Sequence, residues 1–539
     1  MIGARARRLG RSIFPALLTV VVGFAPLSAS AAGDGYFRYR MKSEPRSLDP
    51  ISATTENSQF YFFNIFDGLL EFEPGSLAVV PAVAESWTVS PDGRTYTFKL
   101  RKGARFHNGR EVAASDVVFS LRRALDPTQR SAVLPLLGAI KGAADFSAGR
   151  TTTVSGLAAP DPRTVVITLE RPYAPFLAAL ASVAGSIMPQ EVYSDPKQGY
   201  LKHPVGCGPF KFESWDRGVS IKLTAFPDYW KGKPAIPGIH VRMIPDVATA
   251  LEEYKTDGLD FDNEAPPGRR GWVRDNLKDE YLVWERVATA FIAFNHVRPP
   301  FKGNPVLRRA LNFAVDRERI AHVLQEDKDV ATSRILPPGL LGHNPAPGPY
   351  RFDVQEAKRL LAEAGYPEGR GLPEMTFVTQ DDEAIKRFVE SIQSDFREIG
   401  VNFRIKAMDG GAYSRALAGT DESGADGSLF MIVWFPDLPD PDGFLGVMLQ
   451  SSNFGELGNY SRYSNPEVDR LLDAGRAELD PGRRAAIYRK AEDVALADGC
   501  LIPLYFQRDD GMLKKNIHGF VPNPLGDFAT HLELLHIGP

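Results

Sequence analysis

Cysteine is nearly absent from this chain, since its 539 residues include only Cys207 and Cys500. One disulfide at most is possible, so a small scaffold held together by several disulfides is excluded. The long separation of the two residues in sequence does not show whether their Cβ atoms meet. The alternative to a bridge is two buried thiols that pack as small apolar side chains.

Long hydrophobic runs are absent beyond the N-terminus, where no stretch approaches the roughly 18 apolar residues of a membrane-spanning helix. Residues 1–31 contain four arginines, an apolar run over residues 13–27 and the sequence Ala29-Ser30-Ala31. This order is typical of a secretory signal peptide and predicts cleavage near Ala31. Because no cysteine follows the run to accept a lipid anchor, we expect a free protein of the periplasm.

An excess of positive charge and the common catalytic motifs are absent as well. The net charge is −4, and loss of a leader with four arginines and no acidic residue changes it to −8. Such a surface does not attract nucleic acid. The chain has no G-x-S-x-G elbow, phosphate-binding loop, G-x-G-x-x-G fingerprint or H-E-x-x-H motif. Its nine histidines never lie three or four residues apart on a predicted helix, as a two-histidine metal site would need. From these absences we predict that the protein is not an enzyme and binds neither a metal nor a cofactor.

Strand and helix patterns are present in an irregular mixture. Residues 37–41 alternate apolar and basic side chains like a half-buried strand, and a turn at Ser90–Gly93 joins two strands of a hairpin. Helices are predicted after the N-caps Ser115, Asn304 and Asn465 and over residues 383–399, the last followed by a strand. With no repeat and no regular β-α-β order, these patterns favour an α/β (α+β) protein of several domains.

Acidic residues cluster in one unusual segment, VWFPDLPDPDGFLGVML. There Asp437, Asp440 and Asp442 lie among Trp434, Phe435 and three prolines. Aromatic rings beside carboxylates suit an organic cation. The alternative is an ordinary proline-rich loop whose aspartates cap turns.

Seven motifs appear in one order along the chain: LDP at 48–50 with DGLL; PAVAESWTVSPDGRTYTFKLRKGARFHNG with ASDVVFSLRRALDP; PVGCGPFKFESW; PDYWKGKP; FNHVRPPF with VLRRALNFAVDRERI; LPPGLLG; and NYSRYSNPEVDRLL. Over essentially the whole mature chain, the sequence resembles the family 5 extracytoplasmic solute-binding proteins of ABC transporters, of the oligopeptide- and dipeptide-binding type. The resemblance implies a two-lobed periplasmic binding protein fold with an extra subdomain inserted in the first lobe.

The resemblance also implies domain boundaries. Lobe I would comprise residues 32–74, 199–289 and 502–539, the inserted subdomain 75–198, and lobe II 290–501. The chain would cross between the lobes near residues 286–290 and 500–506, which would act as the hinge. A ligand would bind to one lobe and be enclosed when the other closes over it. The permease and ATPase subunits of an importer would then be the protein's partners, with the binding protein itself a monomer.

The resemblance implies a site for a peptide or a peptide-like amine. In peptide-binding members, the aspartate three residues after a tryptophan at a strand end pairs with the ligand's ammonium group, and Asp437 matches that position. Trp434 and Phe435 would line a side-chain pocket, and Thr54, Thr55 and Glu56 would bind the extended ligand backbone. Dipeptide-type members also hold the ligand carboxylate with an arginine, which is missing from FVTQDDEAIKR here.

Three alternatives to peptide capture stay open. A non-peptide solute, such as an opine or an oligosaccharide, would use the same cleft with little dependence on Asp437. A secreted glycoside hydrolase would need Asp437 and Asp440 as a pair of carboxylates. A chaperone-like binder of unfolded chains would show low selectivity. The sequence leaves the ligand's identity and length, its affinity and the cognate permease undetermined.

Overall fold

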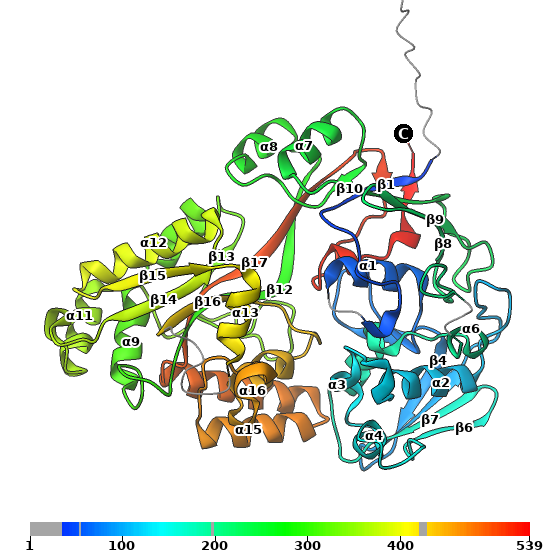
Figure 1. The fold of residues 1–539 in the computed structure, drawn as a ribbon, viewed down its shortest axis with the longest axis horizontal. Coiled ribbons are helices and arrows are strands. Elements are labelled where there is room, and N and C mark those ends of the chain that lie inside the picture. The colour runs from blue at the N-terminus through cyan, green and yellow to red at the C-terminus, as the bar shows by residue number, and fades with distance from the viewer. Residues whose placement is uncertain (1–34, 53–54, 196–198, 420–427, 539) are drawn as a thin grey trace, which may run out of the picture.

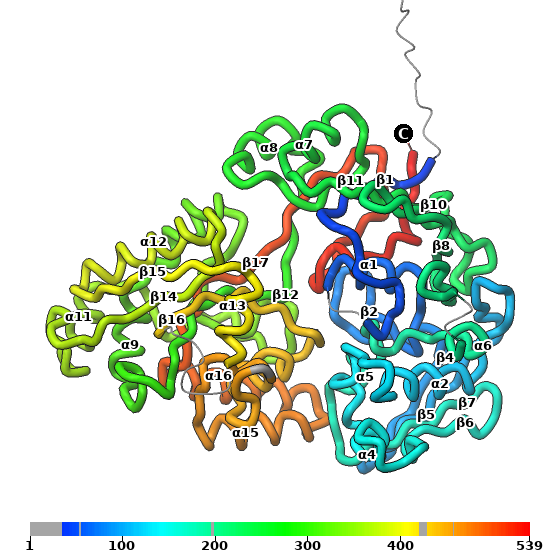
Figure 2. Tube along the Cα trace, viewed as in Figure 1, coloured from blue at the N-terminus to red at the C-terminus, as the bar shows by residue number. Residues whose placement is uncertain are grey.

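The computed structural model describes residues 35–52, 55–195, 199–419 and 428–538, which form two lobes joined by two long strands (Figure 1). The predicted signal peptide lies outside these residues. The joining strands are β12 (Tyr281–Phe294) and β17 (Leu501–Leu513), and they pair antiparallel along most of their length. In Figure 2 the green and red tubes of these strands run side by side from one lobe to the other.

One sheet of eleven strands extends through both lobes, in the order β15-β14-β16-β12-β17-β11-β1-β10-β9-β8, with β13 (Val330–Ala331) paired to β17. On the side of the second lobe, β12 pairs with β16; on the side of the first, β17 pairs with β11. The pairing of β12 with β17 shifts register between Glu285 and Thr289. The two lobes are therefore connected through an irregular part of a single sheet, where Arg286 lies.

The first lobe is drawn mainly in blue, cyan and dark green on the right of Figure 1, and it contains part of the eleven-stranded sheet, a second sheet of four strands and two short two-stranded sheets. The main one carries β1 (Phe37–Met41), β8 (Phe210–Asp216), β9 (Ser220–Ala225), β10 (Gly238–Met243) and β11 (Phe261–Asp262), with α1 (Glu56–Ile65) beside it. The second carries β4 (Ala84–Val89), β5 (Thr95–Leu100), β7 (Thr164–Thr168) and β6 (Leu157–Asp161), with α2 (Ala114–Leu125). Both share one buried apolar core that runs from Phe37 to Leu535 in sequence.

The second lobe has parallel strands covered by helices. Its strands are β14 (Met375–Gln380), β15 (Phe403–Met408) and β16 (Leu429–Trp434), and β14 is parallel to both neighbours. Its main helices are α9 (Pro305–Ala314), α11 (Val354–Glu363), α12 (Glu383–Glu398), α13 (Gly410–Ala418), α15 (Pro466–Ala477) and α16 (Pro481–Ala497). Two apolar clusters fill this lobe, on opposite faces of β16.

Several local predictions are confirmed. The side chains of Asn304 and Asn465 cap α9 and α15, each directly before a proline, and α12 ends at Glu398 beside its predicted stop. Strands β4 and β5 form the hairpin expected around Ser90–Gly93. The two-lobed α/β fold is also as expected. The exact domain boundaries given above stay a prediction.

Two local predictions are wrong. Helix α2 begins at Ala114 rather than after Ser115, and the carboxylate of Asp116 accepts the backbone N–H of Ala113 at 2.9 Å. In β1, Arg40 is completely buried rather than facing solvent, because its guanidinium donates to the carbonyl oxygens of Ile244 at 3.0 Å and Pro245 at 3.3 Å. The alternating pattern did not reveal these acceptors, which come from a distant part of the chain.

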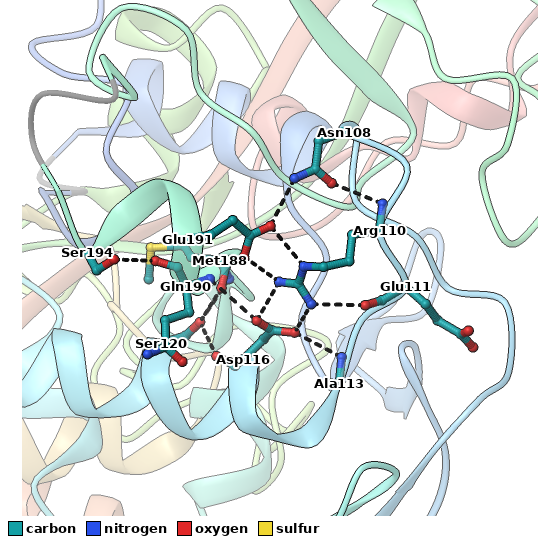
Figure 3. A network of polar contacts seen from close by, with 10 residues as sticks. All are labelled: Asn108, Arg110, Glu111, Ala113, Asp116, Ser120, Met188, Gln190, Glu191 and Ser194. Carbon is teal, nitrogen blue, oxygen red and sulfur yellow. Dashed lines mark hydrogen bonds and ion pairs between the residues drawn. The ribbon is translucent and has the colours of Figure 1, made fainter.

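Asp116 also belongs to a polar network at the start of α2 (Figure 3). Arg110 contacts both Asp116 oxygens, at 2.9 and 2.7 Å, and both Glu191 oxygens, at 2.8 Å each. Asn108 donates to Glu191 at 3.0 Å. Both carboxylates share the Arg110 guanidinium as their basic partner, so the network ties α2 to the segment around Glu191.

The two cysteines are free and buried, Cys207 in the first lobe and Cys500 in the second. Burial raises the pKa of both thiols, which keeps them protonated. The alternative of two thiols packed as apolar side chains is therefore the one the structure has. In the part of the chain that the structure describes, no helix is long and apolar enough to cross a bilayer.

Candidate ligand-binding site

A polar hollow of about 250 Å³ lies between the lobes and is lined by residues of both. We call it the interlobe cleft. It receives Glu56 from α1, Arg286 from β12, Phe435 from the end of β16 and Asp509 from β17. Five basic and five acidic side chains line it in all: Lys42, Arg270, Arg286, Lys328 and Arg508, with Glu56, Glu264, Asp509, Asp510 and Asp527.

Arg286 lies at the centre of the interlobe cleft and is 3 % exposed. It donates to Asp509 at 3.0 Å and to Glu56, and its guanidinium carbon lies 5.0 Å from the ring centre of Phe435. Although burial alone would lower the pKa of Arg286, the charges of Asp509 and Glu56 raise it. Arg286, on the joining strand β12, thus contacts helix α1 of the first lobe and the Phe435 ring of the second lobe.

The predicted first-lobe residues differ in their surroundings. Thr54 lies outside the described residues. The Thr55 side chain caps α1 by accepting the backbone N–H of Ser58 at 3.3 Å. Glu56 reaches the interlobe cleft, where burial raises its pKa although Arg286 opposes the shift. Of the two described residues, Glu56 is therefore the one that lines the cleft, and its carboxylate is paired with Arg286.

A second hollow, of about 370 Å³, opens beside the cleft in the second lobe, and we call it the side pocket. Phe435 lines both hollows and so connects them. The other lining residues are Gln325, Thr379, Gln380, Ala384, Ile385, Phe388, Tyr413, Met431, Val433 and Tyr505. The sequence analysis nominated Phe435 for a side-chain pocket and singled out the segment FVTQDDEAIKR, which supplies Thr379, Gln380, Ala384 and Ile385. The alternation in MIVWF places Met431 and Val433 on one face of β16.

The predicted second-lobe residues lie at the end of β16. The Trp434 indole donates to the Gly443 carbonyl at 2.9 Å and packs edge-on against Tyr460, with ring centres 6.3 Å apart, so it lines neither hollow. Phe435 is 41 % exposed at the junction of the hollows. Asp437 follows it and is exposed, and no hydrogen bond or ion pair with another described residue engages its carboxylate.

The electrostatic setting of Asp437 differs from that of an ordinary surface aspartate. Loss of hydration among the surrounding residues raises the pKa of its carboxyl. Its charge in turn adds to burial in raising the pKa of Tyr460. A carboxylate that is partly desolvated and lacks a partner is stabilised by a cation that arrives from outside the protein.

Asp440 and Asp442 have structural partners. Arg484 of α16 grips both oxygens of Asp440, at 2.7 and 2.6 Å, and this pair is buried. Arg476 of α15 donates to Asp442 at 2.7 Å. The carboxylate pair that a glycoside hydrolase would need is therefore engaged on one side by a buried arginine. In the described ranges, no group of three or more His, Cys, Asp or Glu is arranged to hold a metal ion.

Comparisons with known proteins agree with this architecture. A family model described as bacterial extracellular solute-binding proteins, family 5 middle, matches residues 78–456. The chain is 31 % identical to heme-binding protein A of Haemophilus influenzae, over 93 % of this chain and 92 % of that protein. It is 29 % identical to the dipeptide-binding protein of Escherichia coli, over 93 % and 94 %.

Among solved structures, DppA of Helicobacter pylori in complex with the peptide STSA has a TM-score of 0.76 and 26 % identity. The alignment covers 94 % of this chain and 98 % of that one. The fold and the sequence thus match the same group of proteins along nearly their full length.

Proposed function

Since the chain belongs to family 5 of the bacterial extracellular solute-binding proteins, we propose that it captures a peptide or peptide-like amine in the interlobe cleft. It acts in the periplasm as a monomer and hands the ligand, chemically unchanged, to the permease and ATPase subunits of an ABC importer. The dipeptide-binding relative and the peptide complex of the structural neighbour support this ligand class.

The observation that carries the proposal is the unpartnered carboxylate of Asp437, in the same loop as Phe435, whose ring lines both hollows. An ammonium group gains most where it meets an anion that the protein leaves unneutralised. Phe435 lies two residues away, where its exposed ring can cover an apolar part of the ligand. Glu56 and Arg286 offer polar groups on the opposite side for a peptide backbone.

Closure of the lobes follows from the same arrangement. The interlobe cleft takes residues from both lobes, so a ligand in it contacts Glu56 and Phe435 together only when the lobes are close. Such contacts exist in one state and not in the other, and this difference in contacts is what drives closure. The irregular register of β12 around Arg286 is the part of the connection with the fewest regular ladder bonds to break.

The test is calorimetric titration of the signal-free protein with tri-leucine as the probe peptide. Replacing Asp437 by asparagine should weaken binding by about 2–5 kcal/mol, because the ammonium group loses its counter-charge. Glu398→Gln, at the end of α12 and outside both hollows, makes the same charge change and should leave binding unaltered.

Mass analysis of the recovered peptide should find it intact, with one equivalent bound. Sustained hydrolysis would contradict a transport role. Undiminished affinity in Asp437→Asn would contradict the amine contact, and tight binding of an opine or oligosaccharide instead of peptides would favour a non-peptide ligand.

A further inference from the structure

The side pocket owes its apolar wall to the alternation of side chains along β16. Met431 and Val433 face it, whereas Phe430, Ile432 and Trp434 face the apolar cluster on the other side of the strand. Met431 and Val433 are only half-buried, so the strand keeps apolar surface available on this face near its C-terminal end. A half-exposed apolar face beside a cleft is typical of a surface that binds an apolar group of a ligand.

The remaining walls are also uncharged. Ile385 and Phe388 come from the first turns of α12, and Tyr505 comes from β17, with its ring centre 6.3 Å from that of Phe388. The phenol of Tyr413 donates to the carbonyl of Met431, and Gln325 donates to the Tyr505 hydroxyl at 3.3 Å. Not one of the described residues that line the pocket carries a charge.

The N-terminus of α12 borders the side pocket and is closed to anions. Its backbone N–H groups at Ala384 and Ile385 already donate to the Asp382 carboxylate, at 2.8 and 3.0 Å. Asp381 adds a second negative charge, which pairs with Lys386 at 2.7 Å. A helix N-terminus normally attracts carboxylates. Here the Asp382 carboxylate already occupies it, and the charge of Asp381 repels a further anion.

We propose that the side pocket receives a bulky uncharged apolar group of the ligand, and that the ligand places no carboxylate there. The inference rests on the proposed function and narrows its ligand class to amines that carry a large aliphatic or aromatic side chain. Phe435, shared by both hollows, then separates the apolar group from the charged part of the ligand.

The experiment compares tri-leucine, tri-leucine amide and tri-alanine by calorimetry. The wild-type protein should bind tri-leucine at least tenfold more tightly than tri-alanine, since each buried methylene adds to affinity. Amidation should change the affinity for tri-leucine less than threefold. A loss of tenfold or more on amidation would overturn the inference, because it would reveal a carboxylate contact.

Ile385→Glu places a charge in the pocket while keeping the helix, since an acidic residue in the first turn suits the helix dipole. It should weaken tri-leucine at least tenfold and tri-alanine less than threefold. Arg387→Glu, exposed on the same helix and outside the pocket lining, is the matched control and should change neither. If Ile385→Glu lowers the unfolding temperature, the isosteric Val433→Thr replaces it and should reduce the preference for tri-leucine severalfold.

These measurements distinguish failure of the side-pocket assignment from failure of the proposed function. If Asp437→Asn weakens both peptides but neither pocket variant alters the preference for tri-leucine, the side-pocket assignment is wrong and the proposed function stands. If wild-type protein binds neither peptide, the proposed function fails and the side-pocket assignment fails with it. If Asp437→Asn leaves both affinities unaffected, the amine contact is wrong, and the side pocket is judged by the pocket variants alone.

Discussion

Asp437 and Asp440 stand three residues apart in one loop and have opposite surroundings. Asp440 is buried and held at both oxygens by Arg484, at 2.7 and 2.6 Å. Asp437 is exposed beside Phe435 and has no partner among the described residues. The loop thus has a fixed end, which anchors it to α16, and a free end, whose carboxylate lies two residues beyond Phe435 of the interlobe cleft.

The difference separates stability from function within a few residues. A buried ion pair is costly to form, but once formed it is strongly destabilising to break from one side. A partly desolvated carboxylate without a partner stabilises nothing in the unliganded fold and gains its counter-charge from a ligand. The fixed end should therefore respond to mutation in unfolding experiments, and the free end in binding experiments.

The largest expected effect is at the fixed end. Asp440→Ala should lower the free energy of unfolding by about 3–5 kcal/mol, because it leaves the buried Arg484 without its carboxylate. Denaturant unfolding measures the loss, and Asp437→Ala in the same loop is the matched control. If Asp440→Ala lowers the free energy of unfolding by less than about 1 kcal/mol, the claim that Asp440 stabilises the fold and Asp437 does not is contradicted.

A third acid sharpens the comparison, because Asp67 is buried with neutral partners. It accepts from the Trp230 indole at 2.6 Å and the Tyr229 hydroxyl at 3.4 Å, and burial raises its pKa to about 7 although Lys231 opposes the shift. Between about pH 4 and 7 the folded protein then keeps a proton that the unfolded chain has released. The contribution of Asp67 to stability is therefore fully present below about pH 4 and is lost as the pH rises to 7.

Asp67→Asn removes this titration and should flatten the decline of unfolding free energy by up to about 1.4 kcal/mol per pH unit across that window. Denaturant unfolding of both proteins at several pH values checks it. Parallel pH profiles would show that the Asp67 proton is not retained in the folded state.

The pH dependence of binding probes the free end. An ordinary aspartate has a pKa near 3.9. Because the pKa of Asp437 is raised, its carboxylate becomes protonated at a higher pH than that as the pH falls. Because a neutral carboxyl cannot pair with ammonium, the affinity for tri-leucine should decrease from above that pH. Titrations of wild type and Asp437→Asn between pH 4 and 8 test this, and the decrease should be absent from the variant.

The smallest expected effect is on stability at the free end. Asp437→Asn should change the free energy of unfolding by less than about 0.5 kcal/mol, since no interaction with the described residues is removed. Denaturant unfolding without ligand measures it. A loss of 2 kcal/mol or more would mean that Asp437 supports the fold and would blur the contrast with Asp440.

Local signals made parts of the fold predictable from the sequence. Asn304 and Asn465, each before a proline, marked the starts of α9 and α15, because a cap and its helix are contiguous. The apolar face of α12 and the hairpin around Ser90–Gly93 were likewise visible in short windows. The two-lobed arrangement followed from the resemblance of the motifs and not from these patterns.

Long-range partners were not predictable. The pattern of β1 suggested that Arg40 faces solvent, because its carbonyl partners near Ile244 are far away in sequence. The pairing of Arg286 with Glu56 and Asp509, and of Asp440 with Arg484, depends on the same kind of contact. Asp437 could be nominated from its motif, but its lack of a partner becomes visible only in the folded chain.

The most direct test of the central claim is a thermodynamic cycle on the amine itself. Calorimetry would compare tri-leucine with N-acetyl-tri-leucine, in wild-type protein and in Asp437→Asn. If Asp437 pairs with the ligand ammonium, acetylation should cost the wild type about 100-fold in affinity and the variant less than about threefold. An equal loss in both proteins would contradict the pairing and place the amine elsewhere.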